Sequence, residues 1–200
     1  MFIIVIIPHT RLIPNFGYSI PILFIVWISL KYFDNKFSDI GFSFSHFNIK
    51  AVIIGVIIAV AIVLFTQNIS FPILDYLFDF TEIDVELYNF IRESKWQFLF
   101  IIVMGWLIGG FYEEIVFHGF IFTRFEKMIH GKYSTQLSFL ITSLIFGTYH
   151  YQLGAADAIN AFIVGAIYLA LFLYFKRNLW YSIICHGVYN TIVITLIYFE

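Results

Sequence analysis

Five polar residues of types that can do chemistry interrupt long apolar runs of this sequence. Glu113 and Glu114 follow the predominantly apolar run 98–112, and His150 follows a second run, 137–149. His186 and Asn190 lie one helical turn apart in a third run, so they share one face of a helix. An ionisable side chain near the centre of a bilayer costs about 2.5–3.5 kcal/mol to insert. Residues of these types in apolar segments therefore require an explanation.

The chemistry that these residues support together is hydrolysis. Two adjacent buried carboxylates do not ionise together easily, so one of them can exchange a proton near neutral pH and deprotonate a water molecule. His150 is suited to hold that water. His186 and Asn190 offer N–H donors for the oxyanion that forms when a carbonyl is attacked. Glu113, Glu114, His150, His186 and Asn190 are therefore the candidate catalytic residues.

A metal site is the alternative. Glu113, His150 and His186 supply one carboxylate and two imidazoles, a donor set that binds zinc in other proteins and leaves one position open for water. The sequence contains neither His-Glu-x-x-His nor its reversed form. No cofactor is therefore required by the sequence, and zinc is the weaker of the two interpretations.

Each residue alone also has a structural explanation, because a single membrane histidine often serves as a hydrogen-bonding contact between helices. Depth argues for a shared site instead. At about 1.5 Å rise per residue, Glu113 lies about 13 Å from a boundary at Phe122, and His186 lies about 10 Å from one at Leu179. His150 comes out deeper, at about 21 Å. A tilted helix or a shifted boundary is needed to bring it level.

Helices must position these residues, and the composition places those helices in a membrane. The chain has 200 residues, of which 61% are hydrophobic and only 12% charged, with a mean hydropathy of +0.90. Soluble chains contain about 25% charged residues, and a helix needs about 20 apolar residues to cross a bilayer. The sequence predicts an all-α, polytopic transmembrane helix bundle, with spans near 16–31, 51–69, 97–122, 136–154, 158–175 and 179–199.

The predicted bundle forms one membrane domain, residues 1–200. About six spans use about 120 residues, which leaves only short loops, and no internal repeat or linker divides the chain. The loop 70–96 carries six carboxylates among apolar residues. This pattern is typical of an amphipathic segment at a membrane interface. If that segment crosses instead, the bundle has seven spans.

The distribution of basic residues predicts the orientation of the bundle. Alternate loops divide into two sets, one with eight Lys and Arg residues and the other with three. Because basic loops stay on the cytoplasmic side, both termini are predicted to lie outside. The eight are Lys31, Lys36, Lys50, Arg124, Lys127, Lys132, Lys176 and Arg177, and the three are Arg11, Arg92 and Lys95.

Charge also limits the partners. A net charge of −2 with 11 basic residues excludes a polybasic surface for nucleic acid. The expected partners are a peptide or protein substrate and membrane lipid. The abundance of Ile, Phe, Tyr, Asn and Lys is typical of AT-rich genomes and favours an integral protein of a bacterial cell membrane.

The polar residues carry a resemblance to the CAAX protease and bacteriocin-processing family, also called the Abi family of intramembrane endopeptidases. The family pattern is Glu-Glu-x-x-x-Arg, then Phe-x-x-x-His, then His-x-x-x-Asn, on three separate helices. The corresponding residues here are Glu113-Glu114-Ile-Val-Phe-His118, Phe146-Gly-Thr-Tyr-His150 and His186-Gly-Val-Tyr-Asn190. The order and spacing match over about residues 97–195. The first half of the chain offers no family motif.

One residue departs from the pattern, since His118 replaces the family arginine. It lies four residues after Glu114, on the same helix face. An imidazole titrates near neutral pH, whereas a guanidinium is always charged. His118 and Phe146 are therefore expected to be supporting residues, and any support from the His118 charge depends on pH.

The resemblance implies an intramembrane endopeptidase. By analogy with the family, Glu113 activates the water, and His150, His186 and Asn190 position the water and the oxyanion. A bacterial member would process a peptide or confer self-immunity to a bacteriocin. The alternative is a noncatalytic membrane scaffold or immunity protein that binds a membrane partner. A small transporter would predict internal repeat symmetry, which the sequence lacks.

Overall fold

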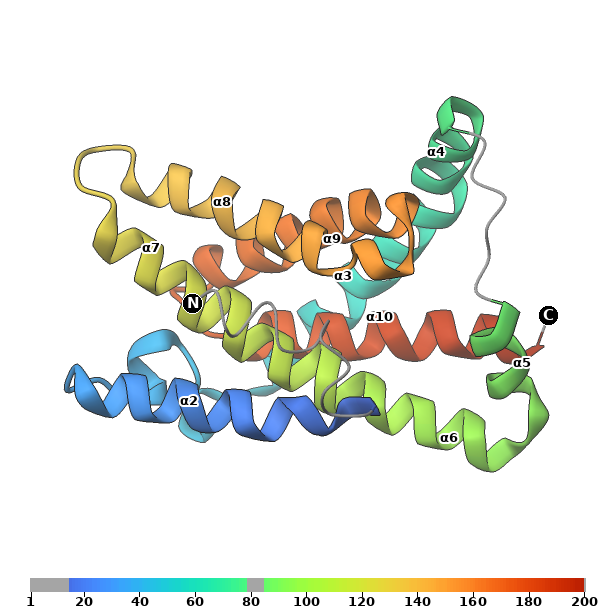
Figure 1. Cartoon of the computed structure of the whole chain (residues 1–200), viewed down its shortest axis with the longest axis horizontal. Coiled ribbons are helices and arrows are strands. Elements are labelled where there is room, and N and C mark those ends of the chain that lie inside the picture. The colour runs from blue at the N-terminus through green and yellow to red at the C-terminus, as the bar shows by residue number, and fades with distance from the viewer. Residues whose placement is uncertain (1–14, 79–84, 200) are drawn as a thin grey trace.

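The computed structural model describes residues 15–78 and 85–199, and this part of the chain contains helices and no strand (Figure 1). The all-α prediction is confirmed. The helices are α2 (Ser19–Tyr32), α3 (Ile49–Phe65), α4 (Phe71–Phe78), α5 (Val85–Glu93), α6 (Lys95–Met104), α7 (Phe122–Met128), α8 (Ser134–Tyr149), α9 (Ala155–Tyr174) and α10 (Trp180–Phe199). The 3₁₀ helices are η2 (Asn15–Tyr18), η3 (Phe37–Ile40), η4 (Phe44–His46) and η7 (Tyr151–Leu153), and the π-helical segments are η5 (Thr66–Ser70) and η6 (Gly105–Ile121).

Four helical segments are long and apolar enough to cross a membrane: Ile49–Leu77, Lys95–Met128, Ala155–Tyr174 and Trp180–Phe199. The remaining two predicted spans are shorter helices, with 14 residues in α2 and 16 in α8. α8 ends at Tyr149 because His150 leaves the helical conformation, and Gly154 then adopts a φ of 118°. The predicted end of this span at residue 154 is therefore wrong. The prediction of about six spans agrees roughly with four long and two shorter apolar helices.

The second span also differs from its predicted end at residue 69. The helix continues from α3 through the π-helical turn η5 into α4, even though Pro72 in the first turn of α4 has no N–H to donate. The first half of the predicted interfacial loop is thus helical. α5 forms its second half and is fixed to α10 by Arg92, whose Nε donates to the Ile197 carbonyl at 2.7 Å. Residues 79–84 lie outside the described part.

The third span is one continuous helical segment, α6–η6–α7, from Lys95 to Met128. It begins where the Ser94 hydroxyl accepts a hydrogen bond from the Gln97 N–H at 3.3 Å. Its 34 residues exceed the about 20 that an upright span needs, so it tilts or projects beyond the hydrocarbon. The central part, η6, is wound as a π-helix. Such winding is rare and is frequent at functional sites.

α10 lies at the centre of the bundle and packs against α3, η6 and α9. Close approach depends on glycine at the contacts. A Cβ at Gly55 would meet the Ile184 side chain at 2.8 Å, and one at Gly110 would meet the Ile183 carbonyl at 3.3 Å. Side chains on the outer face of α3 are exposed and apolar, as expected for a surface that faces lipid; they are Ile49, Ile53, Val56, Ile57, Val60 and Leu64.

The loops with the eight basic residues gather at one end of the bundle (Figure 1). Leu179 N–H donates to the Gly41 carbonyl at 3.1 Å, which joins the α9–α10 loop to the loop after α2. At the same end, the two terminal nitrogens of Arg177 donate to the Glu126 carboxylate at 2.7 and 2.8 Å. The distribution of basic residues predicts that this end faces the cytoplasm.

Candidate active site

Three elements bring the motif residues together. η6 carries Glu113, Glu114 and His118, the C-terminal end of α8 carries Phe146 and His150, and α10 carries His186 and Asn190. α10 crosses η6 in close contact, and α8 reaches η6 with its last turn. The π-helical winding of η6 leaves both adjacent carboxylates buried, with 7% of Glu113 and 0% of Glu114 exposed.

Glu114 is held by two imidazoles. His118 Nδ1 lies 2.7 Å from Glu114 Oε2, and His186 Nδ1 lies 2.9 Å from Glu114 Oε1. Both oxygens of the carboxylate are therefore hydrogen-bonded, one to its own helix and one to α10. Because a buried carboxylate is stable only when it is paired, these contacts make Glu114 an anchor between the two helices.

Glu113 faces the other nitrogens of the site. Its Oε2 lies 3.8 Å from His150 Nε2 and 3.9 Å from His186 Nε2. These separations exceed a direct hydrogen bond and are short enough for a water molecule to bridge Glu113 Oε2 to an imidazole nitrogen. The inferred difference in depth between Glu113 and His150 thus does not keep them apart.

The hydrogen bonds of the two histidines define how their Nε2 atoms can act. His150 Nδ1 lies 2.8 Å from the Phe146 carbonyl, which can only accept, so Nδ1 carries a proton. His186 Nδ1 likewise donates to the Glu114 carboxylate. In a neutral ring the remaining Nε2 then accepts, and in a protonated ring it donates. Each imidazole can therefore hold a water when neutral and stabilise an oxyanion when protonated.

Phe146 packs at the centre of three histidine rings. Its ring centroid lies 4.6 Å from that of His150, 5.1 Å from His118 and 6.2 Å from His186. On the other side, Gly165 of α9 makes room for it, since a Cβ there would lie 3.0 Å from Phe146 Cε1. The phenylalanine of the second motif thus packs against all three imidazoles, and its supporting role stays a prediction.

Asn190 lies beside this group but is turned toward the backbone of η6. Its Nδ2 donates to the Gly105 carbonyl at 3.1 Å. Gly109 allows η6 and α10 to approach closely here, because a Cβ at this position would clash with Asn190 Nδ2 and lie 3.0 Å from His186 Nε2. One N–H of the amide is used in this contact, which leaves the second for a ligand.

The positions of Glu113, His150 and His186 can be compared with those of zinc ligands. Bonds of about 2.0–2.2 Å around a tetrahedral zinc ion place the ligand atoms about 3.3 Å apart, and the separations of 3.8 and 3.9 Å here are wider. Across residues 15–78 and 85–199, no group of three or more His, Cys, Asp or Glu side chains is arranged to hold a metal ion. The Nδ1 hydrogen bonds of the two imidazoles are nevertheless of the kind that orient histidine ligands of a metal.

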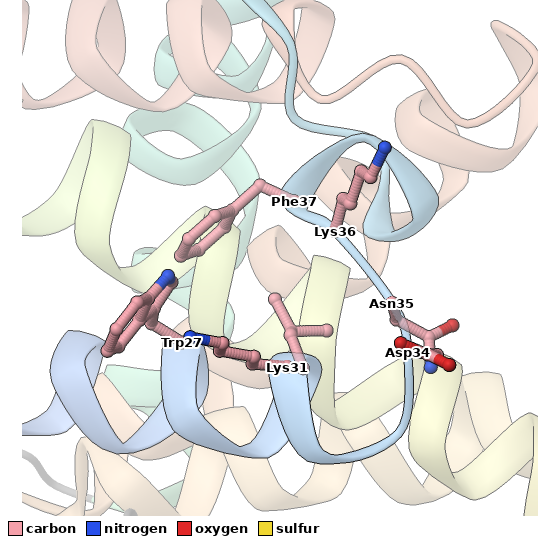
Figure 2. Close-up of a pocket in the computed structure, with 7 residues that line it drawn as sticks. Trp27, Lys31, Asp34, Asn35, Lys36 and Phe37 are labelled. Atoms are coloured by element: carbon pink, nitrogen blue, oxygen red, sulfur yellow. The ribbon is translucent and has the colours of Figure 1, made fainter.

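A pocket at the end of α2 is separate from these residues. Figure 2 shows Trp27, Lys31, Asp34, Asn35, Lys36 and Phe37 around it. Lys31 lies over the Trp27 ring at 5.3 Å, and none of the motif residues lines the pocket. The pocket therefore plays no part in the candidate site.

The motif analysis missed the aromatic residues around the site. Tyr168 of α9 stacks on His186, and Tyr149 hydrogen-bonds Tyr18 at 3.3 Å between hydroxyl oxygens. Tyr112, which directly precedes Glu113 in the sequence, packs edge-on against Tyr18 with ring centroids 5.7 Å apart. Tyrosines are frequent in membrane proteins, so only their tertiary contacts distinguish these.

The comparison with protein families matches the same region. Residues 95–192 match the family model described as type II CAAX prenyl endopeptidase Rce1-like. Comparison with curated proteins and with solved structures gave no match. The matched segment contains all three motifs and every residue of the candidate site. Through residues 95–192, the chain is thus similar to the Rce1-like family of type II CAAX prenyl endopeptidases.

Proposed function

We propose that this protein is an intramembrane endopeptidase in which Glu113 activates a water molecule for hydrolysis of a peptide bond. The observation that carries the proposal is the different setting of the two carboxylates. Glu114 is fully engaged with His118 and His186, whereas Glu113 faces His150 Nε2 and His186 Nε2 at the distance of a shared water. A base needs such a free oxygen beside a held water.

The proposed reaction balances within these residues. Glu113 takes one proton from the water, and the resulting hydroxide attacks the carbonyl carbon of the scissile peptide bond. The free N–H of Asn190 and a protonated His186 Nε2 stabilise the oxyanion. When the C–N bond breaks, the proton passes from Glu113 to the leaving amine. The products are a carboxylic acid and a free amine.

The proposed substrate is a peptide or protein in the membrane of a bacterial cell. The family description supports a CAAX-type substrate with a prenylated cysteine as the first probe. A bacterial peptide precursor is the natural candidate, with peptide processing or bacteriocin self-immunity as the biological role. The basic loops at one end of the bundle support access from the cytoplasmic face.

The test uses the full chain in proteoliposomes. One probe is an internally quenched peptide with farnesyl-cysteine and three C-terminal residues, and the other is a library of unmodified apolar peptides read by mass spectrometry. We expect cleavage by the native protein, and a loss of about 100-fold or more in Glu113→Gln. Glu126→Gln is the matched control, because Glu126 pairs with Arg177 outside the site, and it should retain activity.

Two outcomes favour other functions. If the native protein cleaves neither probe, the noncatalytic scaffold is the better explanation, and His118 in the arginine position would be the residue that supports it. If 1,10-phenanthroline abolishes cleavage and added zinc restores it, Glu113, His150 and His186 hold a metal. Cleavage that is insensitive to the chelator supports the glutamate-activated water.

A further inference from the structure

Tyr168 lies against the site from α9, a helix that carries none of the three motifs. Its ring is fully buried and stacks on the His186 imidazole, with centroids 4.5 Å apart and an angle of 23° between the planes. The same ring faces His118 edge-on, with centroids 6.3 Å apart. Tyr168 therefore contacts both imidazoles that hold the Glu114 carboxylate.

Two polar atoms at this contact have no hydrogen-bond partner within the described residues. They are His118 Nε2 and the Tyr168 hydroxyl, and both residues are 0% exposed. A buried polar group without a partner costs about 1–3 kcal/mol. Since the rings are neighbours, one buried water between the two atoms would satisfy both at once.

The two atoms are chemically complementary. His118 Nδ1 donates to Glu114, so Nε2 accepts a hydrogen bond when the ring is neutral and donates one when it is protonated. A phenol hydroxyl can do either. Tyr168 is thus suited to partner His118 in both of its charge states, which an aliphatic or phenylalanine side chain is not.

We propose that Tyr168 is a positioning residue of the site, whose ring fixes His186 by stacking and whose hydroxyl fixes His118 Nε2 through one buried water. In this arrangement α9 orients both hydrogen bonds to Glu114. The catalytic meaning of this inference rests on the proposed function, but its structural content does not. Besides Glu114, His118 and His186, the titratable groups near Tyr168 are Cys185 and Tyr189 of α10 and Glu113 of η6.

The test is a nuclear magnetic resonance measurement that needs no substrate. The full chain with isotope-labelled histidine is studied in detergent micelles, and the signals are assigned through His118→Gln and His186→Gln. We expect Tyr168→Phe to shift the Nε2 signal of His118, because the hydroxyl is lost, while the ring protons of His186 stay shifted upfield by the stacked ring. Tyr168→Leu should change both signals.

Two control variants keep the result specific. Tyr174→Phe makes the same chemical change on an exposed residue of α9 and should leave both signals unchanged. Thr142→Val removes another buried hydroxyl without a partner in the described part, one turn before Phe146. If Thr142→Val shifts His118 and Tyr168→Phe does not, the water belongs to α8 and the proposal is wrong. An unchanged His186 signal in Tyr168→Leu would also overturn it.

Kinetics with the farnesylated peptide then test the catalytic consequence. Tyr168→Phe should lower kcat about tenfold with little change in KM, as expected for a residue that orients a catalytic group. In a His118→Gln background, the same substitution should have no further effect, because residues that act through one contact are not additive. An additive loss would show that Tyr168 does not act through His118. If no variant cleaves any probe, the proposed function fails, while the resonance shifts still decide the placement of Tyr168.

Discussion

Glu113 and Glu114 are adjacent in the sequence and occupy opposite environments. Glu114 accepts hydrogen bonds at 2.7 and 2.9 Å from imidazoles on two elements and is completely buried. The nearest imidazole nitrogens to Glu113 are 3.8 and 3.9 Å away. A carboxylate whose two oxygens are both hydrogen-bonded is suited to a structural link, whereas one with an oxygen 3.8–3.9 Å from imidazole nitrogens is suited to exchange a proton through a water molecule. The different contacts of these two neighbours are the basis for proposing a different role for each of them.

The largest expected effect separates these functions by substituting the anchor. Glu114→Ala leaves His118 and His186 without their buried partner and should reduce stability by about 3–5 kcal/mol, together with cleavage. Thermal unfolding in detergent and the yield of folded protein measure the first effect. Glu113→Gln, in contrast, should unfold at the native temperature although it does not cleave. Equal stability of the two variants would break the comparison.

The second largest effect is expected at His150, which faces Glu113 and is proposed to hold the reacting water. His150→Ala should lower kcat about 1000-fold, within the range for groups that transfer or hold the reacting proton. Its ring lies at the end of α8 and is partly exposed, so the folded protein should accumulate normally. Full activity of this variant in proteoliposomes would assign His150 to packing alone.

Asn190 provides the third effect. Asn190→Ala removes one candidate oxyanion donor and should lower kcat about 100-fold with little change in KM. Gly109→Ala tests the same place from the facing helix, because its Cβ would clash with Asn190 Nδ2. Gly109→Ala should therefore also lower kcat. A change confined to KM would indicate that Asn190 binds the substrate and does not stabilise the transition state.

The contrast between the two carboxylates could be predicted only in part from the sequence. Residue type and depth indicated that η6, α8 and α10 share polar residues, because membrane segments give few other reasons for ionisable groups. Hydropathy could not show which nitrogen faces which oxygen. It also could not place the end of α8 at Tyr149 or the continuation of Lys95–Met128 beyond residue 122, since both depend on local backbone geometry.

Aromatic packing escaped prediction for a different reason. Tyr168 lies in an apolar helix where a tyrosine is unremarkable by composition, and its significance comes from stacking on a residue of another helix. The spacing of Gly165 and Tyr168 places both on one face of α9, next to Phe146 and His186. A pattern of this kind becomes informative only once the partner helix is known.

His118 gives the smallest expected effect and the finest test of the comparison. It belongs to the anchored side, because its Nδ1 lies 2.7 Å from Glu114 Oε2 and its ring is fully buried between Phe146 and Tyr168. A residue that orients another group typically contributes about tenfold. We therefore expect His118→Ala to lower kcat about tenfold, much less than Glu113→Ala.

The arginine variant distinguishes charge from packing at this position. A guanidinium keeps its charge at all relevant pH values and can pair with a carboxylate through two hydrogen bonds. His118→Arg should therefore preserve or increase cleavage and flatten its dependence on pH between about 6 and 8, the range in which an imidazole changes charge. The measurement is kcat across that range for the native, Arg and Ala forms in the same proteoliposomes. Identical activity and pH profiles in all three would mean that His118 only fills space, and that Glu114 is anchored by His186 alone.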